Sequence, residues 1–179
     1  MTETGTVYGN ALYELAASEE LSEEILSQLQ ALSESFAQEP DFLKLLSAHQ
    51  LSKAERCRII DDGFQGKLHP YVINFLKILT EKGYVRHFSD CCKAYRLRYN
   101  DAHNILPVVA VTAISLRAEQ HSRLKEKLEK QTGKTVQLTN RIDPAVIGGI
   151  RLDFDGKSMD DTVQSRLQSI EHLLYHTML

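Results

Sequence analysis

Cysteine and proline are scarce in this 179-residue chain, which contains three cysteines, four prolines and nine glycines. Such low proline and glycine contents exclude collagen-like and proline-rich disordered proteins. The cysteines are odd in number, and Cys91 and Cys92 are adjacent, which favours reduced thiols over a disulfide framework. Hydrophobic residues make up 42% and charged residues 25% of the chain, which is the composition of an ordinary globular protein.

Long apolar runs are missing as well. The most apolar stretch, residues 105–114, contains Pro107 and Thr112 and is shorter than the roughly 18 residues that a membrane-spanning helix needs. The N-terminus, MTETGTVYGN, has neither the basic start nor the apolar core of a secretory signal. We therefore expect no direct membrane insertion and a setting in the reducing cytosol of a bacterium.

Positive charge is absent from the first 43 residues, and nine carboxylates precede Lys44, the first basic residue. Residues 1–104 hold 11 basic and 15 acidic side chains (−4), and residues 105–179 hold 10 and 9 (+1), which gives the total of −3. Nucleic-acid binding depends on Lys and Arg, so the acidic half argues against a nucleic-acid partner. It suits a basic partner peptide, although a solvated acidic helix surface with no specific role explains it equally well.

The spacing of apolar residues predicts helices throughout the first 100 residues. Residues 8–16 carry an apolar or small stripe at i, i+3, i+4, i+7 and i+8. Ser52 and Glu55 form a capping-box pair. Between Pro70 and Gly83 the chain is apolar on much of a helix circumference, so this helix should be central. The six predicted helices cover about residues 8–16, 21–36, 40–46, 52–63, 70–82 and 85–100.

After residue 104 the pattern changes from helical to strand-like. Residues 105–114 are rich in β-branched side chains, and residues 136–138 and 150–154 alternate with period two. A polar helix over about residues 117–131 separates the first two strands, and a final helix begins near residue 160. The predicted fold class is α+β, mainly α, with a six-helix N-terminal bundle (residues 1–104) followed by a small β-α-β-β-α domain (residues 105–179).

No segment predicts catalysis, a cofactor or a metal site. Residues 133–135 (GKT) and 156–158 (GKS) end like a phosphate-binding P-loop, but Leu128 and Arg151 replace its first glycine. His172 and His176 are spaced i, i+4 without the glutamate of a zinc-protease helix. Adjacent cysteines lack the C-x-x-C spacing of a metal or redox motif. We therefore predict no catalytic residue, no cofactor and no metal.

Several segments together resemble a known family. They are VYGNALYELA near the N-terminus, LEKQTGKTVQL, IDPAVIGGIRLDFDGK and DDTVQSRLQSI. In this order they are similar to the delta subunit of bacterial rotary ATP synthases, the counterpart of the mitochondrial oligomycin-sensitivity-conferring protein. The resemblance covers nearly the whole chain and implies a non-catalytic subunit.

The resemblance also implies partners and contact residues. In the family, the helical domain binds the N-terminal helix of a head alpha subunit between its first and fifth helices, and the C-terminal domain binds the C-terminal ends of the stalk b subunits. The alpha-subunit contacts would be Tyr8, Ala11, Leu12, Leu15, Val72, Phe75, Leu76 and Leu79. Structural roles are also expected. Asp143 and Pro144 belong to the Ile-Asp-Pro turn of the family, and Gly148 and Gly149 would allow close backbone packing or a tight turn. From the sequence pattern itself, Gly133 ends a helix and Asp160 caps the final one.

The implied function is mechanical. Such a subunit is a stator that links the catalytic head of an F-type ATP synthase to the peripheral stalk, so that proton flow drives ATP synthesis. One copy per complex is expected, at the cytoplasmic face of the bacterial cell membrane as a peripheral protein. A cytosolic, helical RNA-binding regulator is the alternative, and the −4 balance of residues 1–104 argues against it.

Overall fold

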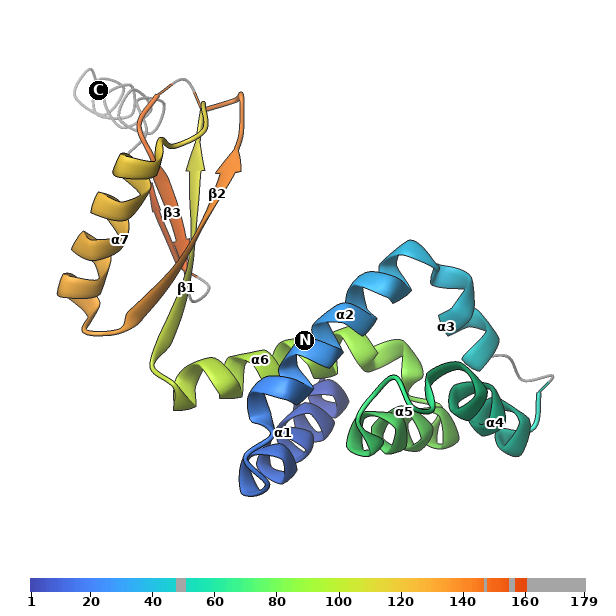
Figure 1. Cartoon of the computed structure of the whole chain (residues 1–179). Coiled ribbons are helices and arrows are strands. Elements are labelled where there is room, and N and C mark those ends of the chain that lie inside the picture. Colours follow the sequence, from blue (N-terminus) through green and yellow to red (C-terminus); the bar gives the residue numbers. More distant parts are fainter. Residues whose placement is uncertain (48–50, 147, 155–156, 161–179) are drawn as a thin grey trace, which may run out of the picture. The chain divides into compact units, whose positions relative to one another are not determined.

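The computed structural model describes residues 1–47, 51–146, 148–154 and 157–160. The chain divides into two compact units, Met1–Tyr99 and a second that begins at Asn100 (Figure 1). The described residues are mainly helical with one small four-stranded sheet, which confirms the α+β, mainly α class. The helices of the first unit are α1 (Glu3–Ser18), α2 (Ser22–Gln38), α3 (Pro40–Leu46), α4 (Lys53–Phe64), α5 (Pro70–Lys82) and α6 (Phe88–Ala102).

Local capping interactions fix several helix ends. The Thr2 hydroxyl accepts a hydrogen bond from the Gly5 amide, so α1 begins earlier than its apolar stripe predicts. The predicted capping box is confirmed, because the Ser52 amide donates to Glu55 Oε2 at 2.8 Å and the Glu55 amide donates to Ser52 Oγ at 3.2 Å. Gly83, with φ 76°, closes α5 in the left-handed conformation that favours glycine.

The last helix of this unit differs from the prediction. A 3₁₀ turn at Val85–His87 precedes α6, whereas the sequence predicts one helix over residues 85–100. The reason is local, because the amide of Tyr84 bonds back to Leu79 across the left-handed Gly83 and the chain leaves α5 in a tight turn. Helix α6 then continues to Ala102, past the end of the predicted segment.

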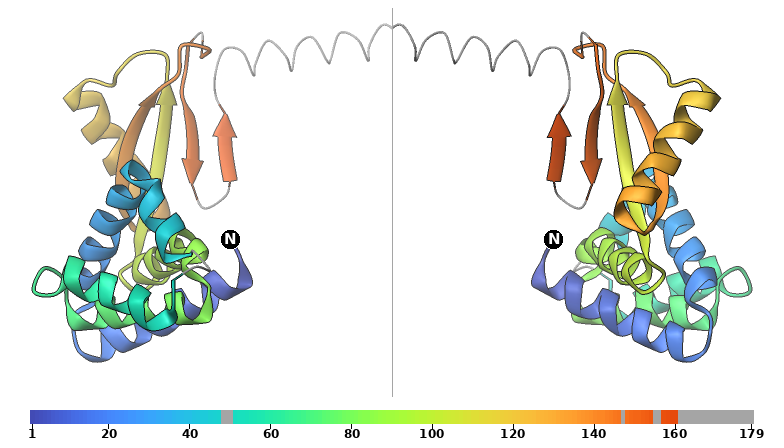
Figure 2. Two further views of the ribbon diagram at one scale, coloured as in Figure 1. Left: turned by 90° about the vertical axis from the view of Figure 1, so that its right-hand side faces the viewer. Right: turned by 90° about the vertical axis from the view of Figure 1, so that its left-hand side faces the viewer.

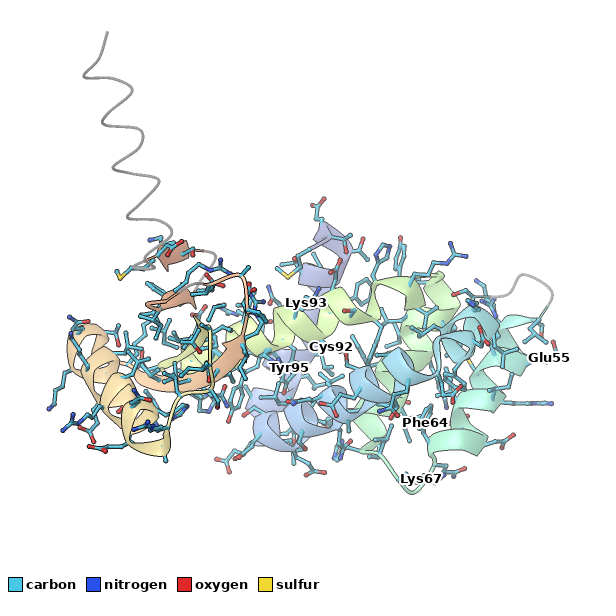
Figure 3. All side chains as sticks on the ribbon, turned by 90° about the horizontal axis from the view of Figure 1, so that it is seen from above. Glu55, Phe64, Lys67, Cys92, Lys93 and Tyr95 are labelled. Atoms are coloured by element: carbon cyan, nitrogen blue, oxygen red, sulfur yellow. The ribbon has the colours of Figure 1, made fainter. Side chains whose placement is uncertain are left out.

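The core of the helical unit is built on α5 and on aromatic contacts. Helix α5 buries side chains around much of its circumference, so its predicted central place is confirmed. Phe36 meets Phe64 and Phe88 with ring centroids 6.4 and 5.1 Å apart. Tyr95 of α6 is fully buried and donates a 2.9 Å hydrogen bond to the Ser22 carbonyl at the start of α2 (Figure 3). These contacts fix α2 and α6 against each other.

The N-terminus of α1 is tied to α6 by a charged side chain. The Thr2 amide and the Thr2 hydroxyl both donate to Asp90 Oδ2 at 2.9 Å. These two bonds favour the ionised carboxylate, so the pKa of Asp90 is lowered from its ordinary value. The bonds therefore hold the first turn of α1 most strongly while Asp90 is charged.

We expect Asp90→Asn to reduce the acid sensitivity of folding. A carboxylate whose pKa is lowered in the folded state stabilises the fold above its unfolded pKa of about 3.9, and that contribution is lost as the pH falls through the folded pKa. The variant should be less stable than the parent near neutral pH, and the difference should shrink between about pH 5 and pH 2. Urea unfolding across this range tests the prediction, and parallel pH profiles would contradict it.

In its described residues, the second unit is a sheet with one crossover helix. Its elements are β1 (Ile105–Thr112), α7 (Ala118–Thr132), β2 (Thr135–Ile142), β3 (Arg151–Phe154) and β4 (Lys157–Asp160). The strand order is β2-β1-β3-β4, with β1 parallel to β2 and antiparallel to β3. Figure 2 shows β4 at the outer edge, antiparallel to β3. The buried core of this unit comprises Val108, Ala110, Leu128, Val136, Leu138 and Leu152.

Strand β4 is an addition to the predicted β-α-β-β-α order. Its sequence, KSMD, exposes all four side chains, so no alternation of apolar and polar residues marks it. Asp160, predicted to cap the final helix, is the last residue of β4. The predicted helix after it, with His172 and His176, lies outside the described residues.

Turn residues connect the strands of this unit. Gly133, with φ 66°, ends α7 as predicted. After β2, Asp143 Oδ1 accepts a 3.0 Å hydrogen bond from the Ala145 amide, which folds the chain back around Pro144. Gly149 has φ 87°, a conformation that favours glycine, and Gly148 precedes it in the same bend. The glycine pair therefore lies in a bend just before β3.

Asn140 connects β2, β1 and the chain before α7. Its Nδ2 donates to the Ala110 carbonyl and to Thr112 Oγ1, each at 2.9 Å. Its Oδ1 accepts a hydrogen bond from the Leu116 amide, also at 2.9 Å. One side chain thus satisfies three polar groups, including the buried Thr112.

Replacing Asn140 with alanine should therefore destabilise the sheet by about 2 kcal/mol, because it removes three hydrogen bonds to partly buried groups. Gln137→Ala is the matched control, since Gln137 is exposed on the same strand. Its expected effect is within about 0.5 kcal/mol. The free energies of unfolding measured in urea decide the question, and equal losses in the two variants would refute the role of Asn140.

Candidate partner-binding groove

An apolar groove of about 440 Å³ lies between α1 and α5. Its lining residues are Tyr8, Ala11, Leu12 and Leu15 from α1, and Tyr71, Asn74, Phe75 and Ile78 from α5. Leu15 and Ile78 are 43% and 45% exposed, which is high for large apolar side chains. Contiguous exposed apolar surface of this kind is typical of an interaction site.

The α1 wall contains all four residues that the sequence predicts for it. Tyr8, Ala11, Leu12 and Leu15 repeat at i, i+3, i+4 and i+7, which places them on one helix face. Leu12 is 5% exposed and lies at the base of this wall, while Leu15 lies at the rim. Ala11 is exposed and leaves space for another side chain because its own is a single methyl group.

The α5 wall differs from the prediction. Of the four predicted residues only Phe75 lines the groove. Val72, Leu76 and Leu79 are completely buried in the core of the helical unit, so they have no surface to offer a partner. These three residues are therefore core residues, and their prediction as partner contacts is wrong.

Tyr71, Asn74 and Ile78 take the places of those three residues in the groove. Sequence reasoning missed them because α5 carries two apolar faces, one toward the core and one toward the groove. The signal was present, since Tyr71, Phe75 and Ile78 are spaced i, i+4 and i+7 and form a second stripe.

Charge on the α1 side of the groove is negative, whereas Glu81 and Lys82 at the end of α5 are opposite in sign. Helix α1 carries Glu3 and Glu14, both exposed, and no Lys or Arg. On α5, Lys77 is paired with Asp61 at 2.6 Å, which offsets its charge. An apolar helix with basic flanking residues therefore fits this groove better than an acidic one.

Helix α1 approaches α6 very closely on a face that does not line the groove. A Cβ atom built on Gly9 would lie 2.4 Å from the Cys91 carbonyl oxygen, and one on Gly5 would lie 2.5 Å from Asp90 Cβ. These two glycines, four residues apart, let the helix backbones pack together. The position of the α1 wall thus depends on contacts that only glycine permits.

Cys91, beside Gly9, and its neighbour Cys92 are not activated as thiolates. Burial raises the pKa of Cys91 to about 11 and that of Cys92 to about 12, so both are protonated at neutral pH. Within the described residues, no group of three or more His, Cys, Asp or Glu side chains is placed to hold a metal ion. The chemistry that the described residues offer at the groove is apolar contact.

The family model for the ATP synthase delta (OSCP) subunit matches residues 5–174. The chain belongs to this family. The ATP synthase subunit delta of Alkaliphilus oremlandii is 30% identical over 167 residues, which are 93% of each chain. That of Mycoplasma capricolum is 32% identical over 166 residues, 92% of each chain. Membership of the delta family is thus shown over nearly the full length.

The fold of this delta-family chain also has a counterpart among solved structures. A chain in the mitochondrial ATP synthase hexamer of Toxoplasma gondii superposes with a TM-score of 0.74, at 16% identity and over 98% of each chain. At this identity the likeness concerns the fold. In the part of the chain that the structure describes, none of the helices has the length and hydropathy of a membrane span.

Proposed function

We propose that this chain is the non-catalytic stator subunit of an F-type proton-translocating ATP synthase. It links the catalytic head to the peripheral stalk, so that proton flow is coupled to ATP synthesis. The observation that carries the proposal is the delta-family match over residues 5–174. The match covers 93% and 92% of the lengths of the two relatives named ATP synthase subunit delta. The chain therefore corresponds to nearly a whole delta subunit, and we propose the function of the whole subunit for it. The comparisons give no support to the RNA-binding alternative.

The head contact is the groove between α1 and α5. An amphipathic helix from the N-terminus of an alpha subunit would insert apolar anchors beside Ala11 and Phe75. Basic residues flanking those anchors would lie near the carboxylates of α1. In this proposal the six helices of residues 1–104 form one head-binding bundle.

The stalk contact falls to the C-terminal domain, residues 105–179, which would bind the C-terminal ends of the b subunits. One copy of the chain would then bridge head and stalk in each complex. The complex would hold it at the cytoplasmic face of the membrane as a peripheral protein. To resist the torque on the head, the chain must bind the head and the stalk at the same time.

The test is a calorimetric titration of the full chain with a peptide matching the N-terminus of the alpha subunit from the same organism. One-to-one saturable binding with a negative heat-capacity change would support the head contact, because apolar surface is buried. A folded chain that does not bind the peptide would overturn it. Titration with RNA completes the test, and strongly salt-dependent RNA binding would revive the alternative.

A further inference from the structure

A second hollow of the helical unit, about 620 Å³ in volume, lies where α4, the end of α5 and the 3₁₀ turn meet. It shares no lining residue with the groove between α1 and α5. The proposed stator role does not use it. Its volume is within the range of about 300–1,000 Å³ that small-molecule sites occupy.

The hollow is strongly cationic. Lys53, Arg56, Lys82 and Arg86 line it, and Glu81 is the one carboxylate among its lining residues. Residues 1–104 as a whole carry a balance of −4, so four positive charges here oppose the general charge of the unit. Among the described residues, the ion pairs within 4 Å include none of these four cations.

Arg56 adds an independent observation. Its Nη1 donates a 3.1 Å hydrogen bond to the Leu46 carbonyl, which fixes the guanidinium beside the end of α3. Its Nε is buried and has no hydrogen-bond acceptor among the described residues. A buried N–H of a charged group without an acceptor is costly, and an oxyanion bound beside the Arg56 guanidinium would offset part of that cost through its charge.

The residue types select the ligand chemistry. A guanidinium presents its N–H groups in a planar fork that matches two phosphate oxygens, and lysine ammonium groups add charge. Tyr84, 38% exposed, also lines the hollow and offers an aromatic face beside the cations. We propose that the hollow binds a small molecule carrying a phosphate or diphosphate group.

Calorimetric titration of the full chain with inorganic pyrophosphate and with ADP, at ~0.15 M salt, tests the proposal. The variant is Lys53→Glu/Arg86→Glu, because both side chains are exposed and make no hydrogen bond or ion pair with the described residues. The matched control is Lys93→Glu/Arg98→Glu on α6, which changes the charge equally outside the hollow (Figure 3 labels Lys93). Circular dichroism of both variants checks that they fold.

Saturable one-to-one binding that weakens at least tenfold in the variant and less than twofold in the control supports the proposal. Equal affinity for pyrophosphate and ADP would show that the phosphate groups alone are recognised. Tighter binding of ADP would indicate that the adenosine moiety also contacts the ring of Tyr84. Absence of saturable binding by either ligand would overturn the proposal. Equal weakening in variant and control would overturn it too, because it would show attraction by net charge without a site. None of these results bears on peptide binding in the groove.

Discussion

Replacing Gly9 with leucine is expected to destabilise the helical unit by about 3 kcal/mol, because an added side chain has no space between α1 and α6. A Cβ on Gly9 would already lie 2.4 Å from the Cys91 carbonyl oxygen and 2.7 Å from Ala94 Cβ. The first neighbour is backbone, so relief requires the helices to separate. Separation would also move the α1 wall of the groove, and peptide binding should weaken together with stability.

Two alanine variants test the contact between α1 and α6 by whether each raises or lowers the stability of the chain. Gly63 lies in α4 with nothing within 4 Å of an added Cβ, so Gly63→Ala should stabilise the chain by up to about 1 kcal/mol through helix propensity. Gly9→Ala gains the same propensity but meets Cys91, and its net effect should be destabilising. Urea unfolding measures both. Stabilisation by Gly9→Ala would show that α1 and α6 are not closely packed.

The sequence predicts those parts of the fold that local chemistry decides. Ser52 and Glu55 cap α4 through bonds made within three residues, and Gly83 and Gly133 end helices by adopting positive φ. The close approach at Gly9 escapes prediction, because its neighbours Cys91 and Ala94 lie far away in the sequence. Strand β4 escapes prediction too, although its partner β3 directly precedes it in the chain. A polar four-residue strand has no period of its own to detect.

The groove was predictable on one wall and not on the other, for a physical reason. On helix α1 the predicted residues Tyr8, Ala11, Leu12 and Leu15 all line the groove, while Ala16 of the same stripe is buried in the core. Helix α5 is apolar on two sides, and periodicity does not tell which side faces the core. Leu76 belongs to the core face with no exposure, and Ile78 to the groove face with 45% exposure. Only the packing of α5 among its neighbours assigns these roles.

The double variant Leu15→Asp/Ile78→Asp should weaken binding of an alpha-subunit N-terminal peptide at least about 100-fold, because two apolar contacts are replaced by carboxylates. Both side chains are exposed at the groove, so the fold should tolerate the change. A bound helix would cover the new carboxylates, and aspartate is too short to reach water past it. Attraction of basic peptide flanks to the added charge would oppose this loss, so a measured loss reports on the apolar contact.

The matched control is Leu45→Asp/Leu97→Asp, which changes two leucines of similar exposure, 42% and 47%, that do not line the groove. The control should bind the peptide as the parent does. In membranes whose ATP synthase carries each chain, the groove variant should hydrolyse ATP with reduced proton pumping, and the control should remain coupled, because a stator without its head contact resists no torque. Full peptide affinity in the groove variant would refute the α1–α5 site. Lost affinity with intact coupling would place the essential head contact elsewhere on the chain.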